Sequence, residues 1–186
     1  MIVHGLGSVK ENHADLAGAL VAAGMGALAL DLRGHGASAG TAGPGMVDDV
    51  LAAVRHLAPG GPVGIRGSSL GAFLALHAAA REPAVRAVAA LCPAVADGLG
   101  QRPGLAWARE MPLEPIVARA DGVARGYWHA TGDEVVPWAR TFALAGLTAQ
   151  PKALRIVMGG HHRSLQHDSR VRAETVAFLA ARLGAG

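Results

Sequence analysis

Apolar residues in this chain fall into short unbroken runs, separated by longer stretches in which they recur at helical spacing. The runs predict strands over residues 1–4, 26–31, 62–67, 87–92, 124–131 and 153–159. Each is apolar nearly throughout, as in parallel strands that helices cover on both faces. The other stretches predict helices over 12–23, 46–58, 70–81, 137–148 and 168–183. This alternation predicts an α/β fold: a doubly wound, mostly parallel sheet of about six strands with right-handed crossovers.

Residues 93–123 interrupt the alternation. Four prolines divide this segment, yet it retains several large apolar residues. Two interpretations stay open: a crossover helix with irregular flanks, or a short cap-like excursion that supplies apolar walls to a pocket. In the second, Trp107, Met111 and Leu113 are the candidate pocket residues. Because the length suits one domain, we predict a single domain over 1–186 with an excursion at about 93–123.

Composition and charge narrow the class of protein. The net charge is +3, but Lys and Arg are scattered without interleaved aromatic residues, which argues against a nucleic-acid partner. The chain lacks an uninterrupted apolar run of about 18 residues and a charged leader, so we expect a cytoplasmic protein with no membrane span. The single cysteine, Cys92, excludes an internal disulfide, and we interpret it as a packed thiol.

The stretch "GIRGSSLGAF" (64–73) contains the chemically most informative residues. It fits the pattern G-x-S-x-G only when Ser69 is the central residue, between a predicted strand and a predicted helix. A turn this sharp strains the backbone, and Gly67 and Gly71 avoid a collision across it. Ser69 would then lie at a helix N-terminus, which favours negative charge nearby. Ser69 is therefore the candidate nucleophile; the alternative is a Gly/Ser-rich turn that only caps a helix.

With this turn, four further segments resemble the α/β-hydrolase superfamily over nearly the whole chain. "IVHGLGS" (2–8) is similar to its oxyanion loop, and "LDLRGHGAS" (30–38) to the loop after its fourth strand. "HATGDEVVP" (129–137) resembles the segment that bears the acid, and "MGGHHRS" (158–164) the segment that bears the base. The resemblance is to the esterase, monoglyceride-lipase and serine-aminopeptidase-like branch. It implies the α/β-hydrolase fold and a nucleophile, acid and base in that chain order.

The resemblance also implies the partners of the nucleophile. Asp133 would be the acid that orients an imidazole; Glu134 is its rival, which we interpret as a solvated loop carboxylate. The base would be His162 or its neighbour His161, and the family's pattern favours His162. A serine needs such an oriented base because its hydroxyl is a weak nucleophile.

Two further roles follow from the same resemblance. The oxyanion hole would consist of the backbone N–H groups of Leu6 and Leu70. Asp31, Arg33 and His35 would brace neighbouring loops, which we favour over a catalytic role for them.

Neither a metal nor a cofactor is expected. His161, His162, His167 and Asp168 are close in sequence, but their spacing matches no standard zinc signature. The stretch "GMGALALD" (24–31) imitates G-x-G-x-x-A, yet it precedes its strand instead of following it. That order removes the dinucleotide interpretation.

The start of the chain departs from the family. Relatives usually begin with an antiparallel pair of strands, whereas here only three residues precede His4. We favour a missing N-terminal piece over a naturally minimal hydrolase. The strand predicted over 26–31 would then be an uncovered edge, open to pairing between subunits, and a homo-oligomer is one expectation.

The predicted function is hydrolysis of small-molecule carboxylic esters through an acyl-enzyme on Ser69. Several alternatives stay open. One is an aminopeptidase-like activity, which would need an anion such as Glu110 or Glu114 to hold the substrate amine. Thioesterase or acyltransferase activity would use the same residues. A fold relative that binds a ligand without turnover is the alternative from outside the enzymes.

Overall fold

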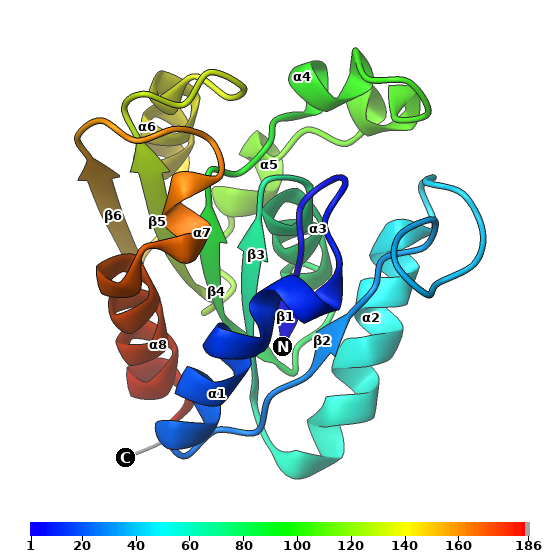
Figure 1. The fold of residues 1–186 in the computed structure, drawn as a ribbon. Coiled ribbons are helices and arrows are strands. Elements are labelled where there is room, and N and C mark those ends of the chain that lie inside the picture. The colour runs from blue at the N-terminus through cyan, green and yellow to red at the C-terminus, as the bar shows by residue number, and fades with distance from the viewer. Residues whose placement is uncertain (185–186) are drawn as a thin grey trace.

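A computed structural model describes residues 1–184 of the chain. Its centre is one parallel sheet in the order β2-β1-β3-β4-β5-β6 (Figure 1). The strands are β1 (Ile2–Val3), β2 (Ala29–Leu30), β3 (Val63–Ser68), β4 (Val85–Leu91), β5 (Ala124–Ala130) and β6 (Lys152–Val157). Each apolar run overlaps one of these strands, so the predicted doubly wound α/β architecture is confirmed.

Helices cover both faces of the sheet, as the unbroken apolar runs require (Figure 1). One face carries α1 (Ala14–Ala22), α7 (Ser164–His167) and α8 (Ser169–Leu183). The other carries α2 (Met46–Leu57), α3 (Leu70–Ala79) and α6 (Trp138–Leu147). The short 3-10 helices η1 (Lys10–His13) and η2 (Ala58–Gly60) flank α1 and α2. Within residues 1–184, no helix is both long and apolar enough to cross a bilayer.

The central helix α3 is buried along its whole length. Its ten residues, "LGAFLALHAA", are almost all apolar, because the sheet, α2 and α5 (Glu114–Val117) surround it. Pro137 and Asp168 stand at the starts of α6 and α8. The Asp168 carboxylate caps α8 by accepting from the N–H groups of Arg170 and Val171 at 2.8 and 3.0 Å.

The strand predicted over 26–31 pairs only at Ala29–Leu30, and it lies at the sheet edge. Its single neighbour is β1, and only two residues of each strand pair with each other. From β1 the chain passes to β2 on one side and later to β3 on the other. Ligands of open α/β sheets bind at such a reversal, outside the carboxyl ends of the strands. The loop after β1 and the turn after β3 meet at this point.

The segment 93–123 contains three short helical pieces. They are α4 (Ala96–Gly100), η3 (Ala106–Glu110) and α5. In Figure 1, α4 stands beyond the carboxyl ends of the strands, whereas α5 lies back against the sheet. Part of the segment therefore overhangs the strand ends and part belongs to the core.

Candidate active site

The turn after β3 holds Ser69 in a conformation that non-glycine residues rarely adopt. Its φ is 52° and its ψ −116°, a strain of about 1–3 kcal/mol that the surroundings must hold in place. The Ser69 N–H donates to the Leu91 carbonyl at 2.9 Å, and its carbonyl accepts from the Ala94 N–H at 3.2 Å. A Cβ at Gly67 would lie 2.5 Å from the Gly71 carbonyl oxygen, and one at Gly71 would overlap the Val3 carbonyl. The turn therefore requires both glycines.

Ser69, His162 and Asp133 form a continuous hydrogen-bonded chain. The Ser69 Oγ lies 3.0 Å from His162 Nε2, and His162 Nδ1 lies 2.7 Å from Asp133 Oδ2. A carboxylate accepts only, so His162 carries its proton at Nδ1 and turns the free lone pair of Nε2 toward the serine hydroxyl. Loops after three parallel strands supply the three side chains, which brings together residues 93 positions apart in sequence.

Four donors surround the Asp133 carboxylate. Oδ1 accepts from the N–H groups of Val135 and Val136 at 2.9 and 2.8 Å. Oδ2 accepts from His162 and lies 3.1 Å from His129 Nε2. Burial raises the pKa of Asp133, but the hydrogen bonds from His129, His162, Val136 and Val135 outweigh it and hold the pKa well below its usual value. Asp133 is ionised at neutral pH.

His129 is a member of this site that the sequence analysis missed. It is fully buried on β5; its Nδ1 lies 2.7 Å from the Thr141 hydroxyl and its Nε2 2.9 Å from the Val136 carbonyl. Because two acceptors, the Val136 carbonyl and Asp133 Oδ2, face Nε2, that nitrogen carries the proton. The sequence feature that could have revealed this role is a histidine in a mainly apolar run, four residues before Asp133.

The two neighbouring histidines occupy different environments. The His161 side chain is exposed, and its Nδ1 accepts from the Arg163 N–H at 3.3 Å. The backbone N–H of His162 donates to Glu134 Oε2 at 3.1 Å. A bond from its own N–H, followed by this bond from His162, lowers the pKa of Glu134. Glu134 is an exposed loop carboxylate, as predicted, and it also binds the backbone of the histidine loop.

The loop after β1 lies directly against Ser69. A Cβ at Gly5 would be 3.4 Å from the Ser69 Cβ and 3.2 Å from the Ser68 carbonyl oxygen, so this approach favours glycine. Leu6 follows it and lines the same cavity as Ser69. Leu70 is the first residue of α3, where N–H groups have no partner within the helix.

The loop after β2 is held by structural contacts, in agreement with the bracing role expected for its charged residues. The Asp31 carboxylate accepts from the Lys10 ammonium and, at 2.8 and 3.0 Å, from the N–H groups of Lys10 and Ala37. These bonds, led by the Lys10 ammonium, hold the pKa of Asp31 far below its usual value. Arg33 forms an ion pair with Asp49 of α2, and His35 Nδ1 contacts the Arg33 carbonyl at 3.1 Å.

A cavity of about 490 Å³ opens beside Ser69 and His162. Its apolar walls come from the β1 loop, α4, the acid loop and α7, and consist mainly of Leu6, Leu91, Val95, Leu99, Val135, Val136 and Leu165. Its cationic residues are Arg102, Arg140 and Arg163, and Asp97 is its carboxylate.

The predicted pocket residues Trp107, Met111 and Leu113 do not line this cavity, and that expectation is corrected. Leu113 is buried in the core, and the Trp107 ring stacks edge-to-face on Phe73 at 6.3 Å. Met111 packs against the same core, and its carbonyl accepts from a buried histidine of α3. The part of 93–123 that lines the cavity is residues 94–102 instead.

Cys92 lies beneath the hydrogen-bonded chain. Its φ is 43°, and its sulfur and one ligand atom each of Asp133 and His162 lie within 4.8 Å of one another. A metal would need the thiolate, but burial, followed by the Asp133 charge, raises the pKa of this thiol far above its usual value. The arrangement fits a neutral packed thiol under an ionised carboxylate better than a metal site.

The sheet, the strained serine turn and the position of the cavity define an α/β-hydrolase fold, and solved structures agree. The alignment with a monoacylglycerol lipase from Paleococcus ferrophilus covers 97% of this chain and 93% of the lipase, at a TM-score of 0.82 and 18% sequence identity. For Est1E from Butyrivibrio proteoclasticus with ferulic acid bound, coverage is 98% and 88%, the TM-score 0.83 and identity 20%. For the esterase domain of a Rhodothermus marinus protein, coverage is 97% of this chain and 83% of that domain, the TM-score is 0.75 and the identity is 22%.

The sequence itself gives the family. The family described as serine aminopeptidase, S33, matches residues 1–120, and the chain belongs to it. A search of curated proteins finds no match.

Proposed function

We propose that the protein is a serine hydrolase that cleaves carboxylic esters through an acyl-enzyme on Ser69. The observation that carries this proposal is the hydrogen-bonded chain from Ser69 Oγ through His162 to Asp133. Ser69, at one end of this chain, lines an open cavity. Ser69 is the nucleophile, His162 the general base and acid, and Asp133 the group that keeps the imidazole in its reactive tautomer.

In the first half-reaction, Ser69 Oγ attacks the ester carbonyl while its proton passes to His162 Nε2. The imidazolium, stabilised by the ionised Asp133, then gives that proton to the leaving alcohol, and the acyl group stays on Ser69. In the second half-reaction His162 takes a proton from water and the hydroxide attacks the acyl carbonyl. The bond between the acyl carbon and Ser69 Oγ then breaks as the proton returns to Oγ, and the carboxylic acid is released. A base of this kind contributes about 10²–10⁴ in rate.

Both half-reactions pass through a tetrahedral oxyanion, for which we propose the N–H groups of Leu6 and Leu70 as donors. The close approach of Gly5 to Ser69 and the position of Leu70 at the start of α3 support this assignment. One such donor is worth about 10²–10³ in kcat.

The cavity favours an ester over an N-terminal amine as substrate. An aminopeptidase needs an anion near the scissile bond, but among residues 1–184 neither Glu110 nor Glu114 lines the cavity. The cavity wall carries three arginines and one carboxylate. This excess of positive charge disfavours the binding of an ammonium group. The similar structures include a monoacylglycerol lipase, an esterase domain and Est1E with ferulic acid bound. We infer a small or medium acyl group, and residues 94–102 as the wall of the pocket.

Hydrolysis of p-nitrophenyl esters of graded acyl length, beside aminoacyl anilides, tests the proposal. We expect turnover of esters by the wild type, a loss of at least about 10³-fold in Ser69→Ala, and retention of most activity in the matched variant Ser68→Ala. Preference for aminoacyl anilides would instead support the aminopeptidase alternative. Absence of turnover on every substrate, with the fold intact, would support a binding protein.

A further inference from the structure

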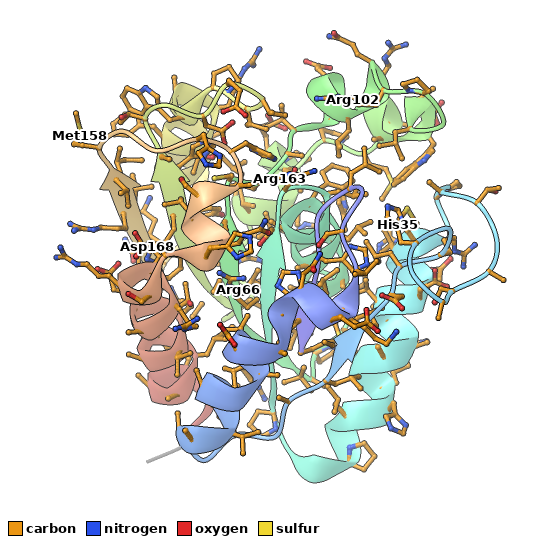
Figure 2. All side chains as sticks on the ribbon, viewed as in Figure 1. His35, Arg66, Arg102, Met158, Arg163 and Asp168 are labelled. Carbon is orange, nitrogen blue, oxygen red and sulfur yellow. The ribbon has the colours of Figure 1, made fainter. Side chains whose placement is uncertain are left out.

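Arg66 is a buried cation without a counter-charge. It lies on β3, three residues before Ser69, and is 1% exposed. All three guanidinium nitrogens lack a hydrogen-bond partner within residues 1–184. In Figure 2 Arg66 lies on the face of the sheet that α1, α7 and α8 cover. The proposed reaction does not use this residue.

The strand neighbours of Arg66 are apolar, and the polar groups near it are the neutral Cys92 thiol, Arg172 and two further unsatisfied groups. Its strand partners are Ile2 on β1 and Ala89 on β4, both in the apolar cluster of this face. His13 Nε2 and Ser68 Oγ are also buried there without a partner in the described part of the chain. Ser68 is two residues further along β3, so its side chain points to the same face as Arg66.

The charges near Arg66 are positive or neutral. Burial, followed by the Arg66 charge itself, lowers the pKa of His13 to about 4, so this imidazole is neutral at pH 7. Arg172, whose charge is also felt at Arg66, forms its own ion pair with Asp15 at 3.4 Å. A guanidinium cannot escape the cost of burial by losing its proton at ordinary pH. One uncompensated positive charge therefore stays inside the protein.

The same chain shows how a buried arginine is otherwise accommodated. Arg125 on β5 is also 1% exposed, but its guanidinium donates to both oxygens of Asp121 at 3.0 and 2.6 Å. Arg66 has the same burial and no carboxylate partner in residues 1–184. A buried charge without a partner of opposite charge is strongly unfavourable. The lack of a negatively charged partner at Arg66 therefore requires an explanation.

We propose that a small monovalent anion of the halide class binds at Arg66, with the Ser68 hydroxyl and the His13 Nε2–H as further donors. One fixed charge matches one negative charge, and a multivalent oxyanion would leave a second charge buried without a partner. Ser68 also lines the cavity beside Ser69, so we expect the anion to enter from that side. The site lies directly behind the serine turn.

Thermal unfolding at constant ionic strength tests this site independently of any hydrolysis. Sodium gluconate, whose anion is much larger than a halide, is replaced stepwise by sodium chloride or bromide. We expect Tm of the wild type to rise with the logarithm of the halide concentration above the dissociation constant, by roughly 5–10 °C at a hundredfold excess. A linear change, or none, would contradict a specific site.

Two variants make the test sharper. Arg66→Met removes the charge at similar volume, so we expect it to lose the halide dependence and to be as stable in gluconate as the wild type or more so. Arg125→Met, the matched control, should keep the halide dependence. Halide stabilisation that survives in Arg66→Met would overturn the proposal.

A second measurement covers the case in which Arg66→Met does not fold. In a wild-type crystal grown in bromide, anomalous scattering should give a peak within hydrogen-bond distance of the Arg66 guanidinium. Water alone at that position would show that solvent, not an anion, satisfies Arg66, and would overturn the proposal.

Discussion

Replacing Asp133 by asparagine preserves shape while reversing one hydrogen bond. Asp133 Oδ1 accepts from two backbone N–H groups, at 2.9 and 2.8 Å, so the asparagine oxygen is held at that position. The new NH₂ group then faces His162 Nδ1, which can only accept from it. His162 must carry its proton at Nε2, toward the Ser69 hydroxyl 3.0 Å away, and it can no longer take the serine proton.

The expected loss is in kcat and is large. A wrong tautomer at such a base lowers kcat by about 10⁴, equivalent to ~5.5 kcal/mol in the barrier. KM should stay within about threefold, because the Asp133 side chain is fully buried and does not touch substrate. The site also loses stability, since the NH₂ group faces His129 Nε2–H, at 3.1 Å in the parent.

Steady-state hydrolysis of a p-nitrophenyl ester measures both constants, with circular dichroism as the check on folding. Asp168→Asn is the matched control: it removes a carboxylate at the start of α8 but keeps the helix cap, so its kcat should equal that of the parent. A folded Asp133→Asn variant that loses less than tenfold in kcat would refute the reasoning, as would a loss confined to KM.

Three further outcomes are expected. Gly71→Ala forces a Cβ onto the Val3 carbonyl and should lower the unfolding free energy by about 3 kcal/mol, visible as a lower urea midpoint; an unchanged midpoint would contradict the packing described. Burial lowers the pKa of His77, on α3, to about 4, so the unfolded state binds more protons between pH 6.5 and 4. The unfolding free energy should therefore decrease by roughly 1 kcal/mol for each unit by which the pH is lowered through that range; His77→Gln should flatten that slope in urea titrations, and an equal slope would disprove it. His161→Ala should leave kcat/KM within about threefold, whereas His162→Ala should lower it at least 10²-fold; the reverse order in ester assays would exchange their roles.

The apolar runs and the serine motif predicted most of what positions the site. Unbroken apolar runs are sufficient for a parallel sheet because both faces are covered, and a strand–turn–helix transition with glycines at 67 and 71 allows one conformation for Ser69. The strand ends were less predictable. The apolar run 26–31 extends beyond its two paired residues, since pairing at an edge depends on the neighbour rather than on hydropathy.

Other parts of the site depend on contacts that spacing does not encode. His161 and His162 differ by one position, and only the path of the loop through Gly159 and Gly160, both with positive φ, decides which ring reaches Ser69. His129 contributes through a side chain buried inside a strand. Trp107 was expected in the pocket, but contact with Phe73 in the core outweighs exposure of a large ring to the cavity.

Covalent labelling of Ser69 Oγ tests most directly whether Ser69 is a nucleophile that His162 activates. After reaction with a fluorophosphonate, peptide mass spectrometry should find one adduct per chain, on Ser69, and none in the His162→Ala variant under the same conditions. An adduct on Ser68, or undiminished labelling without the imidazole, would contradict the account.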